Sequence, residues 1–155
     1  MKSIILYYSR SGNTEKLASK VKQDLECDIL KIEPEKVYGN YIASCIRVIG
    51  ENTRKEKPKF ITEIPNLDIY DVILVGYPIW VSDMPVFVSE FISQCDLNNK
   101  KVIPFATFGK NNISGSIKTL QRACIDAEIM LPFNYGIFKK DDYESWIKSI
   151  QKIIK

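Results

Sequence analysis

The sequence predicts an α/β protein in which a doubly wound, five-stranded parallel sheet carries helices on both faces. Short apolar runs alternate with segments of helical period along the chain. Two of the runs, residues 72–77 and 101–105, are almost continuously apolar, as strands are when a parallel sheet buries both of their faces. The length of 155 residues and the 45% hydrophobic content suit a single domain, residues 1–155, built around one core.

The individual elements follow from the spacing of the apolar residues. Contiguous or alternating apolar residues predict strands, whereas apolar residues that recur every three or four positions predict helices. In chain order we expect a strand at 4–8, a helix through Leu17, Val21 and Leu25, a strand at 28–32, a helix at 41–55, a strand at 72–77, a helix through Val88, Phe91 and Ile92, a strand at 101–105, a helix at 116–123, a strand at 128–131, and a terminal helix through Trp146, Ile147 and Ile150.

Local signals mark the starts of two helices. Pro85 suits the first helical position of the third helix, with Ser82 or Asp83 as its N-cap. The run DDYE at 141–144 resembles a capping box and predicts the start of the terminal helix. Residues 55–65, which contain lysines and prolines, predict a surface loop rather than a linker between domains.

Composition excludes several classes of function. The chain has no histidine, which removes Ser-His-Asp and Cys-His catalysis and the usual histidine metal sites. Its net charge of +3 comes without a dense basic block, so we expect no nucleic-acid partner. No apolar run approaches the roughly 20 residues of a membrane span, so we expect a cytoplasmic protein without membrane contact. Cys27, Cys45, Cys95 and Cys124 form no C-x-x-C pair, and we expect them to be reduced and mostly buried.

The loop after the first strand is rich in short hydrogen-bond donors. Ligands of doubly wound sheets bind beyond the carboxyl ends of the strands, where the strand order reverses. A glycine, hydroxyl groups and the N–H groups of a helix N-terminus suit a phosphate dianion, although an ordinary N-cap by Ser11, Asn13 or Thr14 is the alternative. The loop lacks the G-K-[ST] and G-x-G-x-x-G patterns of nucleotide triphosphate and NAD sites. Its residues are Ser9, Arg10, Ser11, Gly12, Asn13 and Thr14.

Two further loops follow the third and fourth strands. Residues 77–85 contain Trp80, which either covers the edge of the sheet or stacks on a flat aromatic ligand. Residues 107–115 offer backbone and amide groups that can bond the rim of a heterocycle. Because the three loops meet at one edge of the predicted sheet, together they predict a pocket for a phosphate and a planar ring.

Three segments resemble the flavin-contacting loops of flavodoxins. YYSRSGNTEKLA is similar to their phosphate loop, GYPIWVSDMP to the loop that packs against the flavin in short-chain members, and PFATFGKNNISGS to the third loop. The resemblance covers essentially the whole chain. It implies a flavodoxin-like fold with strand order 2-1-3-4-5 and a noncovalently bound flavin mononucleotide (FMN). Residues 128–139 leave no room for the insertion that splits the last strand of long-chain members, which implies the short-chain type.

The resemblance also implies which residues hold FMN. The phosphate would be held by Ser9, Ser11, Asn13 and Thr14, with backbone help from Arg10 and Gly12. One side of the isoalloxazine ring would be held by Pro78, Ile79, Trp80 and Val81, and its edge or other face by Thr107, Phe108 and Gly109.

The second loop departs from the flavodoxin pattern at one position. In many flavodoxins a glycine follows the aromatic residue of this loop, where the backbone changes conformation when the flavin is reduced. Val81 stands near that position, and because a β-branched residue resists positive φ, we expect the change to be costlier here.

For function, the resemblance implies a monomeric carrier that moves one or two electrons between redox partner proteins and uses no catalytic residue of its own. The alternative is an FMN-dependent reductase that passes electrons from NAD(P)H to a quinone or a similar acceptor, usually as a dimer. Carrier flavodoxins are mostly acidic, so the net charge of +3 implies an acidic partner or a use other than bulk electron carriage.

Two other proteins of this fold class fit the sequence poorly. A receiver domain needs acidic residues where Tyr8, Ser9, Tyr77 and Pro78 stand, and a low-molecular-weight phosphatase needs a cysteine in the first loop. Neither requirement is met, so we set both aside.

Overall fold

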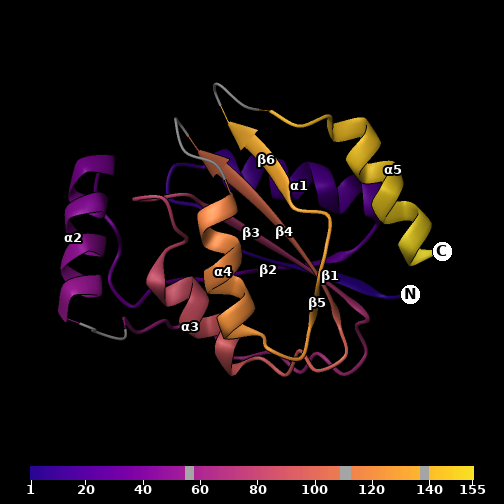
Figure 1. The fold of residues 1–155 in the computed structure, drawn as a ribbon, viewed down its shortest axis with the longest axis horizontal. Helices are drawn as coiled ribbons and strands as arrows, with labels where there is room; N and C mark the ends of the chain where they lie inside the picture. Colours follow the sequence, from indigo (N-terminus) through magenta and orange to yellow (C-terminus); the bar gives the residue numbers. More distant parts are fainter. Residues whose placement is uncertain (55–57, 109–112, 137–139) are drawn as a thin grey trace.

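A parallel sheet lies at the centre of the computed structural model, with helices on both of its faces (Figure 1). The structure describes residues 1–54, 58–108, 113–136 and 140–155. The strands are β1 (Ser3–Tyr7), β2 (Asp28–Lys31), β3 (Val72–Pro78), β4 (Lys101–Phe108), β5 (Glu128–Ile129) and β6 (Phe133–Gly136). The helices are α1 (Asn13–Leu25), α2 (Tyr41–Arg54), α3 (Val86–Gln94), α4 (Ser114–Ala123) and α5 (Tyr143–Ile154).

The strand order confirms the predicted doubly wound topology. The strands run β2-β1-β3-β4-β5, all pairs are parallel, and β6 continues beside the carboxyl half of β4. The chain starts in the interior of the sheet at β1, goes to the edge at β2, and then crosses to the other side at β3. The order therefore reverses between β1 and β3, which is where this architecture binds ligands.

Alternating side chains of the strands divide the core into two layers. On one face, residues such as Leu6 and Val75 join a buried cluster with α3 and α4. On the other face, Ile5 and Leu74 join a second cluster with α1 and α5. Because β1, β3 and β4 contribute to both clusters, they are buried on both sides, as their apolar sequences predict. Helix α2 lies at the margin, away from the centre of the sheet (Figure 1).

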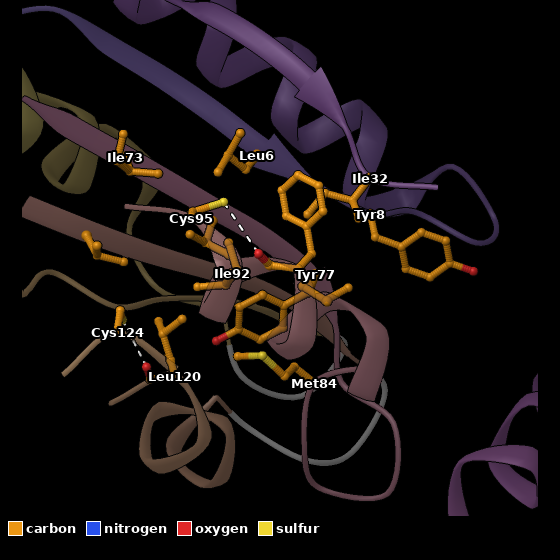
Figure 2. Packing of buried hydrophobic residues seen from close by; sticks show 14 of the residues in the cluster. Leu6, Tyr8, Ile32, Ile73, Tyr77, Met84, Ile92, Cys95, Leu120 and Cys124 are labelled. Atoms are coloured by element: carbon orange, nitrogen blue, oxygen red, sulfur yellow. Dashed lines mark hydrogen bonds between the residues drawn. The ribbon is translucent and has the colours of Figure 1, made fainter. Parts of the chain in front are cut away.

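The cysteines behave as small apolar residues. Cys27, Cys95 and Cys124 are buried, Cys45 is half-buried, and all four are free thiols. The thiols of Cys95 and Cys124 donate to main-chain oxygens one helical turn earlier (Figure 2). Burial raises the pKa of Cys95 to about 12 and that of Cys27 and Cys124 to about 11, so the reactive thiolate is disfavoured.

The last strand is longer than predicted and is interrupted. The sequence predicts a strand at 128–131, whereas β5 and β6 together follow β4 as far as Gly136. Between them Leu131 has a φ of 46° and Pro132 has no N–H to donate, so the ladder breaks there. The carbonyl of Leu131 instead accepts a hydrogen bond of 2.8 Å from the indole of Trp146. Only residues 130–132 separate the two pieces, without an inserted segment.

The predicted N-cap of α3 is wrong, whereas the predicted start of α5 at residues 141–144 is confirmed. Helix α3 begins directly after Pro85, which is itself the N-cap, so neither Ser82 nor Asp83 caps it. Helix α5 is capped by Asp142, whose carboxylate accepts two backbone N–H bonds, while Asp141 bonds to the last strand instead. Sequence patterns therefore place these starts within about one residue but do not distinguish between neighbouring polar side chains.

Candidate cofactor site at the carboxyl end of the sheet

Three loops follow the carboxyl ends of β1, β3 and β4, beside the point where the strand order reverses. The parallel register pairs Pro78 at the end of β3 with Thr107 in β4, so the second and third loops leave the same edge of the sheet. A direct contact then joins the first loop to the third: the buried hydroxyl oxygens of Thr14 and Thr107 lie 2.7 Å apart. The structure therefore brings the predicted phosphate loop and the start of the third loop together.

The first loop leaves the N-terminus of α1 without a side-chain cap. Gly12 is the N-cap residue, with a φ of 90°. The Ser9 hydroxyl accepts a hydrogen bond of 3.0 Å from the Gly12 N–H, and the Asn13 amide donates to the Ser11 hydroxyl at 3.5 Å. The alternative in which Ser11, Asn13 or Thr14 caps the helix is therefore wrong.

This helix end fits a phosphate group. A Cβ built on Gly12 meets no atom within 4 Å, so the space next to the loop is open among the described residues. That space lies at the positive end of the helix dipole, where no side chain among the described residues caps the first-turn N–H groups. Ser11 and Asn13 are exposed beside it, whereas Arg10 reaches away and donates to the Gly39 carbonyl at 3.4 Å. The donor set matches what a phosphate dianion requires.

The second loop turns its aromatic residue into the core. Trp80 is only 2% exposed, and the centroid of its ring lies 5.7 Å from that of Tyr8 and 5.0 Å from that of Tyr38. Pro78 is half-buried and Ile79 is buried, so Val81, at 45% exposure, presents the most accessible side chain of the four predicted flavin contacts. Contact between the Trp80 ring and a flavin stays a prediction, because here the ring packs against protein.

The backbone of this loop is left-handed at two residues. The φ of Val81 is 50° and that of Ser82 is 66°, although a β-branched residue resists positive φ. Hydrogen bonds between Trp80 and Asp83 close the turn around them and hold this conformation. The expectation that a change of backbone conformation is costlier here stays a prediction.

The third loop is described only in part. Thr107 and Phe108 end β4, and the Phe108 ring packs so closely on Gly136 of β6 that a Cβ on this glycine would overlap it. Gly109, the last of the predicted flavin contacts, lies outside the described residues. The Phe108 ring, packed on Gly136, therefore shapes the side of the site nearest β6.

Sequence reasoning missed the aromatic cluster behind the second loop. Arg47 of α2 lies over the ring of Tyr38, with its guanidinium carbon 4.0 Å from the ring centroid. Burial raises the pKa of Tyr8 to about 12, and the positive charges of Arg10 and Arg47 oppose this rise. The Tyr8 hydroxyl points away from the other labelled core residues in Figure 2. Tyr8 lies in the segment that resembles the flavodoxin phosphate loop, but no local pattern connects Tyr38 or Arg47 with the site.

Asn134 of β6 ties two connections around the site together. Its side-chain oxygen accepts a hydrogen bond of 3.1 Å from the Ile113 N–H, just before α4. Its own amide and backbone N–H both donate to the Asp141 carboxylate, at 2.7 and 2.8 Å. The segments that follow β4 and β6 therefore share one buried anchor.

Replacing Asn134 with alanine should lower the free energy of unfolding by about 2–3 kcal/mol, because the Ile113 N–H and the Asp141 carboxylate each lose a hydrogen-bond partner in a mostly buried place. Urea unfolding of the two proteins checks this. Ser149→Ala, which removes an exposed hydroxyl bonded within α5, is the control and should stay within about 0.5 kcal/mol. Equal stability of N134A and the parent protein would contradict the anchoring role.

Two kinds of feature are missing from the described ranges. No three His, Cys, Asp or Glu side chains there gather in a way that would hold a metal ion. None of the helices in those ranges combines the length and apolar character needed to cross a membrane.

Comparisons with solved structures find the same architecture over nearly the whole chain. A protein named as a flavoprotein from Bacteroides uniformis is 27% identical, with a TM-score of 0.82 and 97% of each chain covered. One named in the same way from Bacteroides eggerthii is also 27% identical, with a TM-score of 0.79 and coverage of 99% of this chain and 97% of that one. A flavoprotein in complex with FMN from Lactobacillus acidophilus is 19% identical, with a TM-score of 0.76 and 99% of each chain covered, which shows the shared fold.

Sequence comparison gives the family. No curated protein sequence matches this chain. A family model described as flavodoxin, however, matches residues 2–150. The match includes all three loops at the carboxyl end of the sheet. Together with the strand order and the uncapped start of α1, it establishes that this chain belongs to the flavodoxin family.

Proposed function

We propose that this chain binds FMN without a covalent bond and carries electrons between redox partner proteins. The observation that carries the proposal is the open, uncapped N-terminus of α1 at Gly12, which lies next to the contact between Thr14 and Thr107. Membership of the flavodoxin family supports FMN as the group that occupies it. We also propose that the chain acts as a single-domain monomer in the cytoplasm.

In this proposal the first loop holds the phosphate and the other two loops hold the ring. The phosphate receives the backbone N–H groups at the start of α1 and the hydroxyls of the loop. When bound, FMN supplies the redox chemistry, since its ring accepts and releases one or two electrons. The proposed contacts are Ser9, Arg10, Ser11, Gly12, Asn13 and Thr14 for the phosphate, and Pro78, Ile79, Trp80, Val81, Thr107, Phe108 and Gly109 for the ring.

The protein's own contribution is to bind, orient and exclude water. The loop residues assigned to the ring carry no titratable side chain, so they act through packing and backbone hydrogen bonds rather than as acids or bases. Trp80, Tyr8 and Tyr38 pack against one another as an aromatic wall behind the second loop. The net charge of +3 favours an acidic partner, because opposite charges speed the encounter of two proteins.

An FMN-dependent reductase with NAD(P)H as donor is the second candidate. The positive net charge favours it, because a dinucleotide carries negatively charged phosphates. A carrier and a reductase differ in whether the flavin is reduced by the nucleotide directly. Anaerobic mixing of the FMN-loaded protein with NADH or NADPH should leave the flavin absorbance unchanged over minutes if the chain is a carrier. Prompt bleaching without an added reductase would contradict the carrier proposal and support the reductase.

A further inference from the structure

A row of residues at the carboxyl end of the sheet extends from the candidate site to β6. The parallel register pairs Pro78 of β3 with Thr107 of β4, and Thr107 with Tyr135 of β6. Paired residues of neighbouring strands lie on the same face of a sheet. Here it is the face that α1 covers, because the hydroxyl oxygens of Thr107 and Thr14 lie 2.7 Å apart. Tyr135 is therefore the next residue along this row from the contact with the first turn of α1.

After β6 the chain returns to Tyr135 and places a lysine on its ring. Tyr135 and Lys140 form an isolated antiparallel bridge, and the Asp141 N–H donates to the Asn134 carbonyl at 3.0 Å. The ammonium nitrogen of Lys140 lies 4.5 Å from the centroid of the Tyr135 ring. At such a distance the negative face of the ring attracts the cation. The ring therefore holds the ammonium group at this end of β6.

The two acidic residues that follow Lys140 are bonded elsewhere. The Asp141 carboxylate accepts from the backbone N–H and the side-chain amide of Asn134, at 2.8 and 2.7 Å. The Asp142 carboxylate caps α5 by accepting two backbone N–H bonds. Lys140 is exposed and forms no ion pair with any residue that the structure describes. Its positive charge is therefore open to an anionic ligand at this edge of the sheet.

The acidic residue in the first turn of α1 lies toward the opposite side of the helix. The Glu15 carboxylate accepts a hydrogen bond of 3.0 Å from the Tyr7 hydroxyl and pairs with the ammonium group of Lys31 at 3.7 Å. Tyr7 belongs to β1 and Lys31 to β2, whereas Lys140 lies beside β6. The negative charge of Glu15 is thus drawn toward β2, away from the side on which Lys140 lies.

We propose that Lys140, positioned by the Tyr135 ring, supplies a positive charge to the phosphate end of the cofactor site and makes the chain select flavins that carry a phosphate. This inference rests on the proposed FMN site. The N–H groups at the start of α1 act at hydrogen-bond distance, whereas an ammonium group attracts a phosphate dianion over a longer range. Lys140 is the binding residue in this arrangement, and Tyr135 is a positioning residue.

Titrations with FMN and with riboflavin measure the role of the charge. Lys140→Gln should weaken FMN binding about fivefold and riboflavin binding by less than about twofold, because only FMN carries the dianion. The loss should shrink in about 1 M salt, where the screening length falls to about 3 Å. Lys140→Arg keeps the charge and should restore FMN affinity to within about twofold. Lys118→Gln is the matched control, since it removes the same charge from an exposed position of α4 and should leave both affinities unchanged.

A double-variant comparison measures the role of the Tyr135 ring. Tyr135→Leu should weaken FMN binding about twofold to threefold, because it removes the face on which the ammonium group lies. If Tyr135 acts through Lys140, the double variant should bind FMN no more weakly than K140Q alone. Losses that multiply in the double variant, or a matching loss of riboflavin affinity in Y135L, would show a direct contact with the ring and overturn the positioning role.

Inorganic phosphate gives a readout without flavin. It should protect the parent apoprotein from urea unfolding, and it should protect K140Q less. Equal protection of the two proteins, or FMN affinity in K140Q equal to that of the parent and of K118Q, would overturn the role of Lys140. Failure of the parent protein itself to bind FMN would contradict the proposed function instead, and the phosphate measurement would still decide whether Lys140 serves an anion site.

Discussion

Replacing Gly12 with aspartate should weaken FMN binding about 100-fold and leave the fold intact. Aspartate tolerates the left-handed backbone of Gly12, whose φ is 90°, and its side chain would enter space with no atom within 4 Å. There its carboxylate would repel the phosphate. Two like charges about 5 Å apart at an effective dielectric constant of about 20 repel by several kcal/mol, and a repulsion of roughly 3 kcal/mol is enough to weaken binding about 100-fold. Titration of the apoprotein with FMN, followed by flavin fluorescence, gives the affinities.

The charge of this substitution has an opposite effect on the protein without flavin. A carboxylate at the N-terminus of α1 gains about 0.3–1 kcal/mol from the helix dipole, which offsets part of the cost of a side chain at the positive φ of Gly12, so the G12D apoprotein should be more stable than G12N by about this amount. Gly12→Asn is the matched control, since it has the same shape and backbone tolerance without the charge, and it should bind FMN within about threefold to tenfold of the parent protein. If G12D and G12N bound FMN equally well, the phosphate would not lie at this helix end.

Replacing Trp80 with alanine should lower the free energy of unfolding by about 3–5 kcal/mol, the usual cost of deleting a buried aromatic side chain. The Trp80 ring is 2% exposed and contacts Tyr8 and Tyr38, so its removal leaves a cavity in the wall behind the second loop. The loss is measured by urea unfolding of the apoprotein, so that the result is independent of cofactor binding.

A conservative variant separates packing from other effects at this position. Trp80→Phe keeps most of the apolar contact and should cost only about 1–2 kcal/mol. A W80A protein as stable as the parent would mean that Trp80 lies at the surface in solution, free to stack on a ligand, and would contradict the packing described here. An intermediate loss in W80F and a large loss in W80A support it.

The fold was predictable because it depends on patterns spread over many residues. The continuous apolar run at 72–77 identifies a strand buried on both faces, and the alternation of strands and helices leaves few topologies. The predicted end of the last strand fails because it depends on two residues: Leu131 adopts a positive φ before Pro132. Residues of β6, which include the buried Asn134, lack the apolar continuity that reveals a central strand.

Sequence patterns predict the location of the site better than its individual contacts. Loop composition and topology locate the phosphate end at Gly12, because helix N-termini and glycine have fixed electrostatic and conformational properties. Whether Trp80 faces a ligand or the core depends on distant partners such as Tyr38, which no local motif connects to it. The left-handed Val81 was equally hidden, since its conformation is held by contacts from α4 that override the preference of the residue itself.

The most direct test of an FMN site at this edge of the sheet is a titration of the purified apoprotein with FMN. The flavin fluorescence should be quenched with one FMN per chain and a dissociation constant of about 1 μM or below. Riboflavin, which lacks the phosphate, should bind at least about 100-fold more weakly if the first loop holds that group. Absence of saturable FMN binding, or equal affinity for riboflavin, would contradict the account.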